Sequence, residues 1–122
     1  MNRNLNEGAV RRAWALLLVL FSFSAFGAEE IPPKPERYFN DYAGVTSTEV
    51  QEQLNQKLEA CEKSDSTQVI VAVFPAMQSE SDIADYTQRV AQNWGVGQAR
   101  TNNGAVLFVF VNDRKMYLQV GY

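Results

Sequence analysis

Residues 105–111 have the sequence AVLFVFV, seven unbroken apolar positions between the turn-forming stretches 102–104 (NNG) and 112–114 (NDR). A run this rich in β-branched and aromatic residues is typical of a strand covered on both faces in a parallel sheet. In the following segment, residues 115–120, the apolar Met116, Leu118 and Val120 alternate with less apolar residues. This alternation predicts a hairpin partner whose second face is less deeply buried.

Further strands are predicted upstream of this hairpin. Residues 68–74 form a second continuous apolar run that ends at Pro75, and residues 40–45 form a short strand or turn. Helical patterns separate these segments, and strands joined through helices run parallel. The sequence therefore predicts an α/β fold with a mostly parallel sheet and a C-terminal antiparallel hairpin.

Two helices are expected between the strands. The first should begin at a capping box of Thr48 and Gln51. The second should start near Ser81 as cap, with Asp82 placed at the positive helix start, and end at Gly95. The predicted inner faces are Val50, Leu54, Leu58 and Cys61 for the first helix, and Ile83, Tyr86, Val90, Ala91 and Trp94 for the second.

The amino-terminal segment, residues 1–27, is typical of a secretory signal peptide. Arg11 and Arg12 precede an apolar run, residues 13–26, and Ala25 and Gly27 occupy the −3 and −1 positions of a cleavage site. The alternative is an uncleaved membrane anchor, although a spanning helix needs about 20 apolar residues and this run is shorter. The sequence thus predicts an exported protein, periplasmic or extracellular, with membrane association left open.

The rest of the chain divides into an extended, proline-rich lead-in, residues 28–37, and one globular domain, residues 38–122. The net charge of the whole chain is −3, and removal of residues 1–27 makes the remainder more acidic. Nucleic acid is therefore not expected as a partner, because its binding needs clustered Lys and Arg. Histidine is absent and Cys61 is the only cysteine, which excludes imidazole-based catalysis, histidine zinc sites and an intrachain disulfide.

Carboxylates follow the predicted strands at the edge where ligands favour an open α/β sheet. They are Asp41 before the first helix, Glu80 and Asp82 after the second strand, and Asp113 after the third. Carboxylate oxygens are ligands that calcium or magnesium takes. Each position also has a structural interpretation, as a turn former, a helix-start charge or a hairpin turn. No serine has a base that the sequence identifies, so the catalytic residues are unknown, and no organic cofactor is indicated.

Five short motifs occur together in residues 38–122, in the order NDYAGV, WGVG, NNGAVL, DRK and VGY. In this order and spacing they resemble the TPM domain family. The family includes bacterial secreted or membrane-anchored proteins, an animal receptor-associated protein, and a thylakoid-lumen protein of photosystem II repair reported as an acid phosphatase. The resemblance implies a three-layer α/β/α sandwich, in agreement with the predicted order of elements.

The resemblance also implies divalent-cation binding, with calcium reported for family members. Carried over, it favours Asp41 and Asp113 as ligands because they lie within matched motifs, whereas Glu80 and Asp82 lie in a variable loop. Family members continue beyond residue 122 with further helices that complete the sandwich. The expectation is therefore a C-terminally truncated domain, with apolar surface from Val106 to Val120 in need of cover.

Three functions follow from this resemblance. The first is a cation-binding accessory or assembly module of the cell envelope, acting on an envelope or membrane protein. The second is a metal-assisted acid phosphatase acting on phosphomonoesters, with its small-molecule substrate unknown. The third is a nonfunctional fragment.

Overall fold

The computed structural model describes residues 29–96 and 103–121. The predicted signal peptide, residues 1–27, lies outside the described residues. Of the predicted turn at residues 100–104, residues 100–102 lie outside them too, whereas Asn103 and Gly104 already belong to a strand. Within the described part, no helix combines the length and the apolar character needed to cross a membrane.

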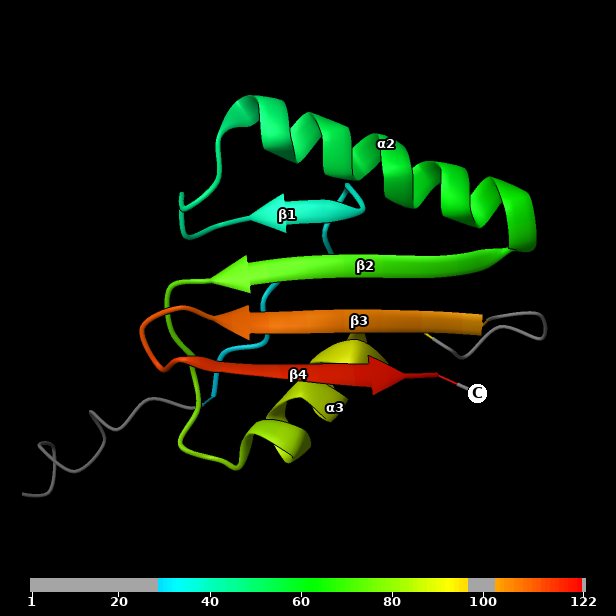
Figure 1. The fold of residues 1–122 in the computed structure, drawn as a ribbon. Coiled ribbons are helices and arrows are strands. Elements are labelled where there is room, and N and C mark those ends of the chain that lie inside the picture. Colours follow the sequence, from blue (N-terminus) through cyan, green and yellow to red (C-terminus); the bar gives the residue numbers. More distant parts are fainter. Residues whose placement is uncertain (1–28, 97–102, 122) are drawn as a thin grey trace, which may run out of the picture.

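A four-stranded sheet forms the centre of the fold (Figure 1). Its strands are β1 (Phe39–Asp41), β2 (Thr67–Phe74), β3 (Asn103–Phe110) and β4 (Lys115–Val120), and the helices are α2 (Thr48–Asp65) and α3 (Ile83–Asn93). The strands lie in the order β1-β2-β3-β4, with the first three parallel and β4 antiparallel to β3. The predicted α/β fold, with its parallel sheet and C-terminal hairpin, is confirmed.

Helix α3 covers one face of the sheet and builds the main core with it. Its predicted inner residues Tyr86, Val90, Ala91 and Trp94 are all buried, whereas Ile83 is half-buried. They pack on alternate residues of β2 and β3, which are Ile70, Ala72, Val106, Phe108 and Phe110. The ring of Phe108 stacks on Trp94 with the centroids 5.5 Å apart. The start of α3 differs from the prediction, because Asp82 itself is the N-cap and accepts from the Ala84 N–H at 3.0 Å.

Helix α2 lies along the β1 edge of the sheet and packs on β1 and β2 (Figure 1). Its cap is Ser47, whose Oγ accepts from Val50 N, and not the predicted Thr48. The predicted apolar stripe is not a buried face: Val50 is exposed, while Leu54, Leu58 and Cys61 are only half-buried. The one buried residue of α2 is the polar Asn55. Hydrogen bonds between the Asn55 side chain and the backbone of Phe39 in β1 therefore hold this helix to the sheet, in addition to apolar contacts.

The apolar side chains of β4 point away from α3, which reverses the expected burial of this strand. Gln119 faces the helix instead, and its Nε2 donates to Ala84 O at 3.0 Å and to Thr87 Oγ1 at 2.9 Å. Met116, Leu118 and Val120 are 67%, 54% and 50% exposed. The amphipathic pattern was identified correctly, but its apolar face lies toward solvent.

An open apolar face results on the side of β3 and β4 opposite α3. The β4 side chains Met116, Leu118 and Val120 lie in register with Val109, Leu107 and Ala105 of β3, and the three β3 residues are half-buried. We call these six residues the open face. In the described part of the chain neither helix covers it, as Figure 1 shows with α3 behind these strands and α2 at the far edge. In the described part of the chain β3 is thus covered by a helix on one face only, and the apolar surface expected to need cover between Val106 and Val120 is present on the other face.

Candidate functional site: the carboxyl edge of the sheet

The loops after β1, β2 and β3 meet at the carboxyl edge of the parallel strands (Figure 1). Two backbone bonds join the second and third of them: Val111 N donates to Phe74 O at 3.0 Å, and Asn112 N donates to Pro75 O at 2.8 Å. Of the four predicted metal ligands, Asp41 is the last residue of β1, and Glu80, Asp82 and Asp113 lie in the loops after β2 and β3 at this edge. Their individual hydrogen bonds decide which of them is available to a ligand.

Asp41 organises the loop that leads from β1 into α2. Its Oδ1 accepts from the N–H groups of Ala43 and Gly44 at 3.0 and 2.8 Å, and its Oδ2 accepts from Thr46 N and Thr46 Oγ1 at 2.7 and 2.5 Å. Gly44 adopts a left-handed backbone with φ +69°, which glycine tolerates without strain. Four donors fill the acceptor capacity of one carboxylate.

The electrostatics of Asp41 agree with this geometry. Burial raises the pKa of the Asp41 carboxyl, but hydrogen bonds from the Thr46 side chain and from the backbone of Thr46, Ala43 and Gly44 outweigh it, so that the pKa lies below its ordinary value. The donors therefore stabilise the charged form without any metal ion.

Asp113 connects the turn after β3 to the loop after β2. Its Oδ2 accepts from the N–H of Met77 at 2.8 Å, and the side chain is otherwise exposed. One carboxylate oxygen thus fixes the neighbouring loop, which carries Glu80 and Asp82. Of these two residues, Asp82 caps α3 by accepting the Ala84 N–H through Oδ2, and Glu80 is exposed.

The arrangement does not fit a metal held through Asp41, because its oxygens are already bonded. Within residues 29–96 and 103–121, no three His, Cys, Asp or Glu side chains are grouped so that they could hold a metal ion. The topology does bring Asp113 to the loop that bears Glu80 and Asp82, as predicted. A ligand role for these four residues stays a prediction.

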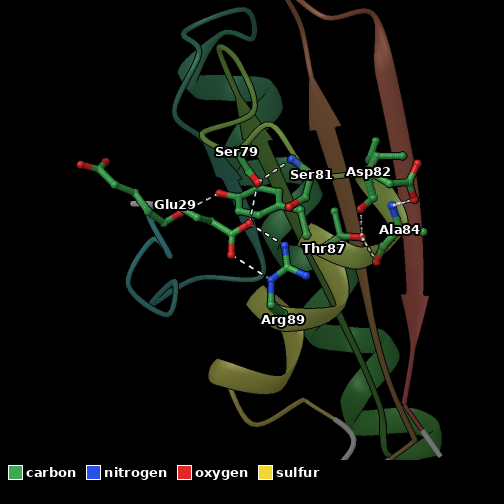
Figure 2. A network of polar contacts seen from close by, with 10 residues as sticks. Glu29, Ser79, Ser81, Asp82, Ala84, Thr87 and Arg89 are labelled. Atoms are coloured by element: carbon green, nitrogen blue, oxygen red, sulfur yellow. Dashed lines mark hydrogen bonds and ion pairs between the residues drawn. The ribbon is translucent and has the colours of Figure 1, made fainter. Parts of the chain in front are cut away.

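A network that the sequence did not reveal fixes the lead-in to α3 (Figure 2). Arg89 Nε and Nη2 donate to the two carboxylate oxygens of Glu29 at 2.8 and 2.6 Å, and Ser79 Oγ donates to Glu29 Oε1 at 2.5 Å. Further along, Tyr86 Oη donates to Glu30 O at 2.9 Å and Trp94 Nε1 donates to Pro32 O at 2.8 Å. The proline-rich segment is thus docked on the domain, although no periodicity in its sequence could indicate this.

The Ser79–Glu29 pair is not a nucleophile with a base. Hydrogen bonds from Arg89 and Ser79 lower the pKa of Glu29 to about 2, far from the near-neutral value that suits a general base. Within the described residues, the hydroxyl of Ser79 therefore has a structural partner, which is consistent with its further acceptance of the Ser81 N–H at 3.0 Å.

Replacing Glu29 by glutamine is expected to release the lead-in from α3. The pKa of Glu29 is lowered from its ordinary 4.5 to about 2, so its contribution is complete above pH 4.5 and is lost as the pH falls toward 2. The Trp94 indole N–H resonance should report the change, in a Trp14→Phe background. At pH 7 we expect the Trp94 resonance of the variant to be shifted from that of the parent. The parent resonance should shift only when the pH is lowered. An unchanged resonance in Glu29→Gln would contradict this role of the ion pair.

The comparisons with known proteins agree with this fold. Residues 39–122 match the family described as the TPM domain. The chain is similar to the solution NMR structure of the N-terminal domain of a P. gingivalis protein, with 30% identity and a TM-score of 0.63, covering 70% of this chain and 54% of that one. A second solved structure, the N-terminal domain of the cg2496 protein from Corynebacterium glutamicum, has 18% identity and a TM-score of 0.60, covering 80% and 62%.

This second similarity supports the fold alone, given its low identity. No curated protein matches the chain. The chain spans a little over half of the first solved structure and under two thirds of the second. Since the family match covers more than two thirds of this sequence, the chain belongs to the TPM domain family.

Proposed function

We propose that this chain is a non-catalytic TPM-type accessory module that docks through its open face onto an apolar segment of an envelope or membrane protein. The basic residues and apolar run at the amino terminus support a location outside the cytoplasm. Both oxygens of Asp41 are engaged by four protein donors, which favours this function over a metal-assisted phosphatase whose ion would be held by Asp41 and Asp113.

The observation that carries the proposal is the exposure of Met116, Leu118 and Val120 on one side of β4, beside half-buried apolar residues of β3. Contiguous apolar surface on a small domain marks an interaction site. The open face carries no charged side chain, so it offers no electrostatic partner for an ionic surface. Its complement is an apolar face such as that of an amphipathic helix, which packs on a sheet by burying its apolar stripe.

Site-specific cross-linking tests the docking surface. A photoreactive phenylalanine analogue at position 118 in cells that produce the protein should give one discrete adduct with an envelope or membrane protein. The same analogue at Gln56, an exposed position on α2, is the matched control and should give none. Adding Met116→Lys should reduce the position-118 adduct about tenfold or more, because a buried lysine at an apolar interface is left unpaired. An adduct only between two copies of this chain, or none, would overturn the proposal.

A divalent cation at the carboxyl edge is the second part of this proposal. The described residues hold no group of three such ligands, so the cation would rest on single carboxylates among Asp113, Glu80 and Asp82, with water completing its coordination, rather than on Asp41. Asp113 and Asp82 each accept one N–H hydrogen bond through Oδ2, from Met77 and from Ala84, and their other carboxylate oxygens are available to a cation. With few protein ligands, calcium should bind weakly, with a dissociation constant on the order of 1 mM.

Calcium titration followed by NMR should therefore perturb residues 77–82 and 112–114, and Asp113→Asn should weaken the binding about tenfold, as expected when one of few carboxylates is lost. Asp65→Asn, at the far end of α2, is the matched control with the same change of charge. If calcium perturbs both variants and the parent equally, its binding reflects the net negative charge of the chain and not a site at the carboxyl edge. The loss of binding only in Asp41 variants that remain folded would reassign the ligand.

A further inference from the structure

A pocket of about 350 Å³ lies between the docked lead-in and the carboxyl end of β2. Its walls include Ile31 and Pro32 from the lead-in, Phe74 and Ala76 from β2 and its loop, and Tyr86 from α3. The surface of the pocket is mostly apolar, and its volume lies within the range of small-molecule sites. Neither the open face nor the predicted cation ligands contribute to it.

The walls of this pocket are fixed by bonds on both sides. Glu30 is paired through both backbone groups, since its N–H donates to Gln78 O at 3.3 Å and its carbonyl accepts from Tyr86 Oη at 2.9 Å. The Glu29–Arg89 ion pair and the Trp94–Pro32 bond hold the lead-in before and after this point. On the opposite wall, Phe74 is stacked between Tyr42 and Phe110, with centroid distances of 5.1 and 5.9 Å. Such a pre-formed pocket needs little ordering when a ligand binds.

The charge around the pocket is negative. Among the lining residues in the described part of the chain, Glu30 alone is charged, and the neighbouring Glu29 is neutralised by Arg89. The pKa of the Tyr86 phenol is raised, first by burial and then by the negative charges of Glu29 and Glu30. An anion such as a phosphate ester or a carboxylate would therefore be disfavoured at this mouth.

We propose that this pocket binds a small aromatic amine, with its ring against Phe74 and Tyr86 and its cationic group at the carboxylate of Glu30. Because both faces of Phe74 are covered by Tyr42 and Phe110, the ligand ring would meet the edge of Phe74, and edge-to-face contact is a favoured geometry for aromatic pairs. The carboxylate of Glu30 attracts the ammonium group. The proposal goes beyond the docking function and does not depend on it, because the pocket lies on the α3 side of the sheet.

Three ligands of similar shape and different charge test this proposal on the full chain by calorimetry and NMR. They are tryptamine, which is cationic, tryptophol, which is neutral, and indole-3-acetate, which is anionic. Tryptamine should bind with a dissociation constant on the order of 1 mM, as expected for a ligand of this size. It should bind roughly fivefold tighter than tryptophol, in line with one partly exposed ion pair, and indole-3-acetate should be weakest.

Two variants assign the binding to the pocket. Glu30→Gln should reduce the affinity for tryptamine to that for tryptophol and leave the latter unchanged, whereas Glu36→Gln, at an exposed residue outside the pocket, should change neither. Ala76→Phe should fill the pocket and abolish the binding of all three ligands. Equal or tighter binding of indole-3-acetate, an unchanged charge preference in Glu30→Gln, or no binding of any ligand at about 10 mM would each overturn the proposal.

Discussion

Replacing Asp41 by alanine is expected to lower the free energy of unfolding by about 3 kcal/mol, because four donors lose a charged acceptor. The figure is well below the sum of four separate bonds, since the loop is partly exposed and its N–H groups regain water. For a domain of this size it corresponds to a fall in melting temperature of about 15 °C. Urea unfolding at pH 7 measures the free energy directly.

Two comparisons separate the role of Asp41 in the loop from a role as metal ligand. Thr46→Val removes only one of the four donors to Asp41 and should cost about 1 kcal/mol. Calcium should stabilise the parent and Asp41→Ala to the same small extent. A variant that keeps full stability but loses the response to calcium would show that Asp41 is a ligand and that the loop does not need it.

The effect of Asp41 should also depend on pH. Because the pKa of this carboxyl lies below its ordinary value of 3.8, its stabilising contribution is complete above that pH and is lost as the pH falls through the lowered value. The difference in stability between the parent and Asp41→Ala should therefore be largest near neutral pH and shrink in strong acid. A difference that grows on acidification would contradict this account.

Replacing Asn55 by leucine is expected to cost about 3 kcal/mol as well, for a different reason. The Asn55 side chain is 5% exposed; its Oδ1 accepts from Phe39 N at 2.8 Å, and its Nδ2 donates to Phe39 O at 3.2 Å and to Gln51 O at 2.9 Å. It thus replaces the strand partner that β1 lacks on its outer edge. Leucine would leave the backbone N–H and C=O of Phe39 buried without partners.

The matched control is Gln56→Leu, an exposed position on the same helix, which should change the stability by less than about 0.5 kcal/mol. Asn55→Asp keeps the acceptor for Phe39 N but loses the donor, so its cost should be intermediate. Hydrogen exchange at the Phe39 amide gives a local readout: it should accelerate strongly in Asn55→Leu. If Asn55→Leu is as stable as the parent, the edge of β1 is held by apolar contacts alone.

The order of elements was predictable because each rests on a local pattern. The unbroken apolar runs in residues 68–74 and 105–111 identified the two long parallel strands, and the helical spacing of Tyr86, Val90 and Trp94 identified a truly buried face. The site was only partly predictable. The carboxylates were placed at the correct edge, because strand ends follow from topology. Their bonding partners could not be inferred, since Asp41 binds its own loop while Asp113 binds the loop after β2.

The sequence by itself determined the α/β fold, the hairpin, the family and the acidic carboxyl edge, because periodicity, turn residues and motif order are local properties of the chain. Tertiary structure alone decided which apolar stripe is covered. The sequences of α2, α3 and β4 each carry an apolar stripe at the period of their own element, yet only the stripe of α3 is buried in the core. An apolar stripe in the sequence shows only that one face of an element is apolar. Whether that face is buried depends on the element that packs against it, and this packing is decided by contacts between distant segments.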